Sequence, residues 1–135
     1  MILNMRNGNL KKIYFIILLV FILFNKAQAI PIDGKVVSLH VLDKVTSRVE
    51  TIEIQVGEII QFDSLQIEIF LCKKRPPEEI PEDFVLLRIY DEVSPENLEI
   101  VFQGWMISSS PSVSPFEHPI YDVWVKDCKI DIESE

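Results

Sequence analysis

The amino-acid sequence predicts an all-β protein, a small antiparallel sandwich or partly open barrel of about six to seven strands. Three observations support this fold class. Apolar and polar residues alternate with a period of two in several short stretches, as in Leu65–Cys72. Turn residues separate these stretches, and no convincing amphipathic helix follows residue 29. Short strands spaced by turns are typical of sandwiches and barrels.

The first 29 residues resemble a cleaved secretory signal peptide. Basic residues and no acid precede the apolar run Ile13–Phe24, and the small-residue pattern Ala27-Gln28-Ala29 follows it. This run is shorter than the roughly 20 residues that a helix needs to cross a bilayer. We therefore expect cleavage after Ala29, a single mature domain over residues 30–135, and no stable membrane anchor.

The expected mature domain is strongly acidic. The leader contains four of the 13 basic residues and none of the 21 acidic ones, so residues 30–135 carry a formal net charge of −12. Such a domain is repelled by nucleic-acid phosphates and by anionic lipid headgroups. Nucleic acid is therefore not an expected partner, and the charge excess is accounted for most simply by solubility.

In the first half of the mature chain, we expect an extended arm followed by four strands. Residues 30–35 form the arm because a proline and a glycine lie close together there. Alternation of apolar and polar residues is cleanest in the second and fourth strands. The predicted strands are 36–42, 48–56, 59–62 and 65–72.

The second half supplies a proline-rich loop and three more strands. The segment 75–83 contains three prolines and four acids, so it cannot form a central strand. A turn at 91–97 and a Ser/Pro-rich connection at 108–119 separate the strands that follow, and residues 129–135 form an acidic tail. The predicted strands are 84–90, 99–107 and 121–128.

Cys72 and Cys128, the only cysteines, are predicted to form a structural disulfide across 56 positions. Because side chains two apart on a strand share a face, we expect Phe70 and Trp124 to flank the bridge. The alternative is a redox-active Cys72 whose thiolate is favoured by the basic residues 73–75. No Cys-x-x-Cys motif supports that alternative.

Catalytic and metal sites receive little support. His118, with the serines of 108–114 and Asp122, offers a conceivable serine, histidine and aspartate trio, but no strained Gly-x-Ser-x-Gly turn is present. The two histidines do not make a zinc site, because the two cysteines are expected to be joined in a disulfide. The acids of 78–83 lack the glycine and the spacing of a calcium-binding loop. We expect no catalytic residue, no metal and no cofactor.

A candidate interaction surface comes from the loops and from the aromatic residues. Trp105 is out of phase with Phe102, Gly104 and Met106, so one of the two sets faces the core and the other can be exposed. Because tryptophan is mostly buried in small domains, we expect Trp105, Phe116, Tyr121 and Trp124 all to lie in the core, with an exposed Trp105 or Tyr121 as the alternative. An exposed tryptophan or tyrosine beside a proline loop is a typical contact anchor. The candidate surface comprises Lys73, Lys74, Arg75, Pro76, Pro77, Trp105, His118, Tyr121 and Asp122.

Several motifs together resemble an exported, uncharacterised family of alphaproteobacteria, the family of domain of unknown function 2155. They span residues 42–128 and include CKKRPPEE at 72–79, GWM at 104–106, SSPS at 109–112, and EHPIYDVW at 117–124. The resemblance implies a periplasmic protein of Gram-negative bacteria in which both cysteines belong to the family pattern. It implies no reaction, substrate or partner.

Three functional hypotheses follow. The first is a non-enzymatic periplasmic module that binds an envelope protein or assembly through its loops, the usual location of function on a β scaffold. The second is a small hydrolase that uses His118 with Asp122, or a carboxylate pair. The third is a sandwich that holds a lipid or a peptide in its interior or at an edge.

Overall fold

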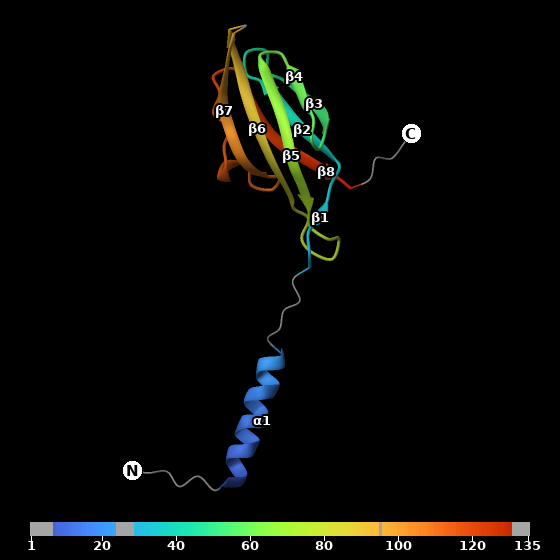
Figure 1. Ribbon diagram of the computed structural model, residues 1–135, viewed down its shortest axis with the longest axis vertical. Helices are drawn as coiled ribbons and strands as arrows, with labels where there is room; N and C mark the ends of the chain where they lie inside the picture. The colour runs from blue at the N-terminus through green and yellow to red at the C-terminus, as the bar shows by residue number, and fades with distance from the viewer. Residues whose placement is uncertain (1–6, 24–28, 95, 131–135) are drawn as a thin grey trace, which may run out of the picture.

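Two antiparallel sheets packed face to face form the fold in the computed structural model, which describes residues 7–23, 29–94 and 96–130 (Figure 1). The sheets do not close into a barrel, so the sandwich form of the prediction is confirmed. The larger sheet contains β1 (Ile32–Asp33), β4 (Ile59–Phe62), β5 (Leu65–Lys74), β6 (Asp83–Ser94) and β7 (Asn97–Ile107), and the smaller contains β2 (Val36–Asp43), β3 (Arg48–Gln55) and β8 (Tyr121–Lys129).

The order of the strands places the first and last parts of the domain beside each other. In the larger sheet, β6 pairs with one side of β5, β1 and β4 pair with different parts of its other side, and β7 lies outside β6. In the smaller sheet, β2 lies between β3 and β8. The connection from β7 to β8 contains the short 3-10 helix η1 (Pro111–Val113) and carries the chain from one sheet to the other.

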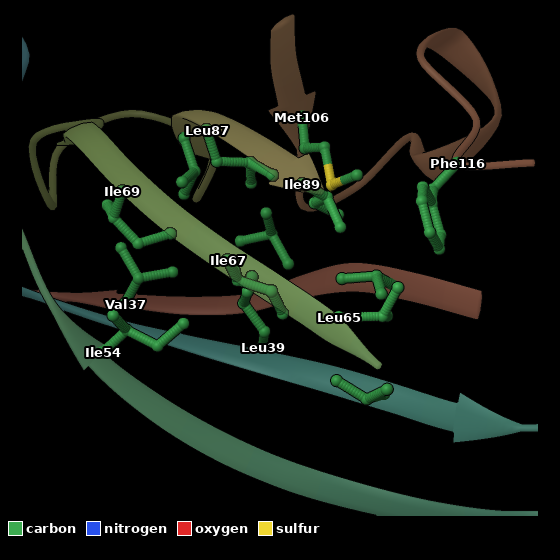
Figure 2. Packing of buried hydrophobic residues seen from close by; sticks show 14 of the residues in the cluster. Val37, Leu39, Ile54, Leu65, Ile67, Ile69, Leu87, Ile89, Met106 and Phe116 are labelled. Carbon is green, nitrogen blue, oxygen red and sulfur yellow. The ribbon is translucent and has the colours of Figure 1, made fainter. Parts of the chain in front are cut away.

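The inward-facing residues of both sheets form one core. On β5 the side chains of Leu65, Ile67 and Ile69 are fully buried, and they alternate with half-buried polar residues. Figure 2 shows them pointing toward Leu39 and other residues of the smaller sheet. The period-two pattern therefore predicted correctly which side of this strand faces inward.

Two β-bulges bring the cysteines together. On β5 the register shifts between Ile69 and Leu71, and on β8 it shifts opposite the Ser38/Leu39 step of β2. Each bulge changes which residues point inward, so Cys72 and Cys128 face the core even though strict alternation would place them outside. Their Cα atoms lie 6.0 Å apart and they form a disulfide between the two sheets. The predicted bridge is thus confirmed.

The same bulges overturn the prediction that Phe70 and Trp124 flank the disulfide. Phe70 is half-buried below the guanidinium of Arg88, and Trp124 is half-buried beside His40 of the neighbouring strand. Neither ring shares the inward direction of its cysteine. The assumption of unbroken alternation along both strands was wrong, because each strand contains one extra residue at its bulge.

The predicted arm at 30–35 is extended and is paired with both sheets. Ile32 and Asp33 form β1 against the end of β5. The backbone N–H of Gly34 then donates to the carbonyl of Cys72 in the larger sheet, and that of Lys35 donates to Lys129 in the smaller one. A Cβ atom at Gly34 would overlap both disulfide sulfurs. The absence of a side chain there allows the chain to cross directly over the bridge.

The element bounds differ from the prediction mainly at one hairpin. Strand β6 continues to Ser94 and β7 begins at Asn97, so the turn is shorter than the predicted 91–97, and Pro95 within it lies outside the described residues. Within the predicted leader, α1 (Asn7–Leu23) is helical. The remainder of that leader at 1–6 and 24–28, and the tail at 131–135, lie outside the described residues. Among those that are described, no helix is long and apolar enough to span a membrane.

Candidate interaction surface

The outer side of the larger sheet carries an apolar surface that we call the Trp105 face. Cross-strand pairing places Leu71, Leu86 and Trp105 in one row, and Phe84 and Ile107 in the next. Trp105 is 43% exposed, so the expectation that all the aromatic residues lie in the core was wrong. Leu71 is 40% exposed, and the other members are half-buried. The residues of the Trp105 face are Phe70, Leu71, Phe84, Leu86, Trp105 and Ile107.

The Trp105 face exists because the first part of β6, from Phe84 to Leu87, is apolar on both of its sides. Val85 and Leu87 point into the core and are fully buried, whereas Phe84 and Leu86 alternate with them and point outward. Within the described part of the chain, no second layer covers this outer side. An exposed apolar surface of this kind is a candidate interaction site.

Two arginines border the Trp105 face. The guanidinium carbon of Arg75 lies 5.6 Å from the centre of the Phe84 ring, and that of Arg88 lies 5.1 Å from the Phe70 ring. Arg88 Nε also donates to Gln103 Oε1 on β7 at 2.9 Å. A cation over the face of an aromatic ring is attracted by it, which favours these positions of the two arginines at the rim of the Trp105 face. They also place positive charge around one apolar surface of an otherwise acidic chain.

Strand β7 combines the exposed tryptophan with an open edge. In the described residues, β7 pairs with β6 alone. Glu99 is the only charged residue among its 11 positions, whereas the edge strand β3 of the smaller sheet carries Arg48, Glu50 and Glu53 in eight. Charged side chains on an edge strand discourage pairing with other chains. By this criterion β3 is protected and β7 is open to an added strand.

His118 lies inside the molecule, where it has a structural role. Its Nε2 is 3.1 Å from Asp91 Oδ2, while its Nδ1 accepts hydrogen bonds from the backbone N–H groups of Ile120 and Tyr121 at 3.2 and 3.1 Å. These bonds fix the tautomer with the proton on Nε2. The ring also stacks with those of Phe116 and Tyr121, at centroid separations of 5.6 and 5.5 Å.

The acid beside His118 is therefore Asp91, a residue that we did not predict, whereas Asp122 lies elsewhere. The hydroxyl of Ser64 donates to Asp91 at 2.7 Å and lowers the pKa of that carboxyl, and the hydrogen bond from His118 adds to this effect. Neither imidazole nitrogen has a lone pair available for a nucleophile, because Nδ1 is engaged by two backbone donors. In this arrangement His118 does not meet the geometry of a general base.

The serines proposed for the same trio are engaged with a different acid. Ser108 donates to Glu82 Oε1 at 3.0 Å, and both the backbone and the hydroxyl of Ser109 donate to the Glu82 carboxylate. These bonds attach the start of the Ser/Pro-rich connection to the end of the proline loop. The structure thus brings together two predicted loops, yet it does not bring together a serine, His118 and Asp122.

Lys74 holds the region of the disulfide together. Its ammonium donates to Asp127 Oδ1 at 2.6 Å and to the carbonyl of Cys128 at 3.2 Å, and it lies 3.4 Å from Asp83 Oδ1. Burial raises the pKa of Asp83, and its Oδ1 accepts no hydrogen bond from any residue that the structure describes. The sulfurs of Cys72 and Cys128 are almost completely buried, so the basic residues do not act on an accessible thiolate.

The other members of the candidate surface divide between buried and exposed positions. Tyr121 is buried, and burial together with the nearby Asp63 carboxylate raises the pKa of its phenol. Pro76 is buried and Pro77 is exposed. Lys73 forms an ion pair with Asp33 of β1. Of the predicted set, Trp105, Arg75 and Lys73 lie at the same end of the outer side of the larger sheet.

Sequence reasoning missed the features that define this surface. The open edge of β7 depends on the order of strands, which no local pattern contains. The outward position of Leu86 had a visible signal. Apolar residues occupy both odd and even positions of 84–90, and this indicates apolar residues on each side of the sheet.

Among the described residues, no group of three or more His, Cys, Asp or Glu side chains is placed to hold a metal ion.

Fold and surface together define a disulfide-bridged antiparallel β-sandwich with an exposed apolar face. A family model described as "Uncharacterized protein conserved in bacteria (DUF2155)" matches residues 37–128, and the chain belongs to this family. The sequence resemblance noted above is thereby confirmed.

One relative is the uncharacterized protein RP359 of Rickettsia prowazekii (strain Madrid E). It is 36% identical over 96 residues, which cover 71% of this chain. The match spans 60% of the relative's own length. No solved structure matches the chain.

Proposed function

We propose that this chain is an exported, non-enzymatic module that binds a protein partner of the bacterial envelope through the Trp105 face and the edge of β7. In this proposal residues 1–29 are a cleaved leader, and residues 30–135 work as one domain in the periplasm. The leader pattern and the buried disulfide support an oxidising compartment outside the cytoplasm.

One observation carries the proposal: a 43% exposed tryptophan lies on an edge strand that has almost no charge. An extended segment of the partner would pair with the free backbone groups of β7, as in strand addition to other sheets. Its outward side chains would pack beside Trp105, which supplies a large apolar contact at a low cost in conformational entropy. This arrangement gives the partner both hydrogen bonds and an anchor.

The charge distribution indicates the character of that partner. The expected mature chain has a net charge of −12, so a second acidic copy is repelled at long range, while a neutral or basic segment is not. Arg75 and Arg88 at the rim are neutralised in part by Glu79 and Glu68. The partner segment is therefore expected to be apolar at alternate positions and poor in acids.

Affinity capture from the envelope fraction of the native host tests this proposal with matched variants. Ile100 on β7 and Val49 on β3 are each 53% exposed on edge strands of different sheets. Ile100→Lys should abolish capture of the partner, because a lysine on an edge strand opposes strand addition. Val49→Lys is the control and should leave capture unchanged. Trp105→Ala should weaken binding of the captured partner about 30-fold, as expected for a central anchor.

Two results would contradict the proposal. One is a wild-type chain that enriches no envelope protein above the level found with Ile100→Lys. The other is a partner that is lost equally with Val49→Lys and with Ile100→Lys. Unfolding curves of all variants must superimpose on that of the wild type, so that a loss of capture reports on the surface rather than on stability.

A further inference from the structure

A recess lies beside the smaller sheet. It has a volume of about 400 Å³, with strands β2 and β8 forming one wall and the connection from β7 to β8 forming the other. Most of its lining is apolar: Leu42 on β2, Pro111, Pro115 and Phe116 of the connection, and Trp124 on β8. Among the described residues that line the recess, Asp122, also on β8, is the only charged one.

The indole of Trp124 and the carboxylate of Asp122 are presented side by side. They are two residues apart on β8, so both project from the outer side of the smaller sheet. Both are half-buried. The imidazole of His40, on the neighbouring strand, contacts the Trp124 ring at a centroid separation of 5.5 Å. The tryptophan is thereby supported from one side.

Asp122 differs from two other half-buried acids, Asp91 and Asp127, in lacking a partner among the described residues. Asp91 accepts from Ser64 and lies against His118, and Asp127 binds Lys74. In the part of the chain that the structure describes, no hydrogen bond or ion pair reaches the Asp122 carboxylate. A carboxylate at an apolar recess, unpaired and partly removed from water, is complementary to a cation with an apolar stem.

We propose that this recess binds a basic side chain, arginine in particular, from a partner polypeptide. A guanidinium is planar, so it can stack on the Trp124 indole while its N–H groups donate to the Asp122 carboxylate. Lysine offers a point charge that is more strongly hydrated and stacks less well. The prolines and Leu42 then surround the methylene stem. The excess of acidic residues in the chain favours the approach of such a ligand.

Tryptophan fluorescence can report on this site alone. The chain has two tryptophans, so the variant Trp105→Phe leaves Trp124 as the only indole. The probe is the peptide acetyl-Ala-Arg-Ala-amide, and its control is the same peptide with citrulline, which keeps the shape of arginine and removes its charge. We expect a saturable change in Trp124 emission with the arginine peptide at millimolar concentration and a clearly weaker one with citrulline.

A pair of charge variants completes the test. In the same background, Asp122→Asn should weaken binding of the arginine peptide about threefold to fivefold, the range for a partly exposed ion pair. Glu117→Gln removes an equal charge from an exposed position in the connection from β7 to β8 and should leave the affinity unchanged. Three results would overturn the proposal. They are equal affinities for the arginine and citrulline peptides, no saturable binding of the arginine peptide, and an equal loss of affinity in Asp122→Asn and Glu117→Gln.

Discussion

Removal of the bridge between Cys72 and Cys128 should cost about 4 kcal/mol of unfolding free energy. In the chain-entropy treatment, a cross-link between residues 56 positions apart lowers the conformational entropy of the unfolded state by about 14 cal/mol/K. At 25 °C this corresponds to about 4 kcal/mol of stabilisation. Small domains are typically stable by about 5–15 kcal/mol. The double variant Cys72→Ala/Cys128→Ala should therefore lose a large part of its stability.

Urea unfolding followed by tryptophan fluorescence measures this loss, with the oxidised wild type as the reference. Each single variant, Cys72→Ala or Cys128→Ala, breaks the same bridge, so each should cost nearly as much as the double variant. The slope of unfolding free energy against urea should also rise, because the unfolded chain expands without the cross-link. A loss of unfolding free energy below about 1 kcal/mol in the double variant would refute the reasoning. So would a double variant whose loss equals the sum of the losses in the two single variants.

Three further predictions concern residues around the same sandwich. Gly34→Ala should cost about 1–3 kcal/mol in urea unfolding, because its new Cβ overlaps both disulfide sulfurs, and an equal stability would contradict this. The pKa of Asp91 lies below its ordinary value of 3.8, so its contribution to stability is present above pH 3.8 and is lost as the pH falls through the lowered value. Asp91→Asn should thus be less stable than the wild type at neutral pH, and the difference in unfolding free energy should disappear in acid. A difference that does not change with pH would count against this role of the Asp91 carboxylate. The pKa of Asp83 is raised by burial, so its ionised form opposes folding at neutral pH. Asp83→Asn should be at least as stable as the wild type at pH 7, and this difference in stability should vanish as the pH falls through the raised pKa of Asp83. A variant less stable than the wild type at pH 7 would contradict this and would show that the ion pair with Lys74 outweighs burial.

Local alternation was sufficient to predict most of the strands but could not reveal where they shift register. Ile67, Ile69, Val85 and Leu87 point inward as a period of two requires. A bulge depends on the partner strand, so the inward turn of Cys72 had no local signal.

Long-range pairing explains why the candidate surface was only partly predictable. Alternation placed Trp105 and Met106 on opposite sides of the strand, but the favoured expectation that Trp105 is buried was wrong, because the structure exposes Trp105 and buries Met106. His118 and Asp91 are 27 positions apart, so their hydrogen bond depends on how the Ser/Pro-rich connection folds back toward β6. That connection has no periodic pattern from which its path could be inferred.

Backbone hydrogen exchange of the chain, free and bound to its captured partner, tests the central claim most directly. Strand addition predicts that amides along β7 exchange at least about tenfold more slowly in the complex, while those of β3, the other edge strand compared above, keep their rates. Unchanged exchange along β7, with protection at some other surface, would contradict the account.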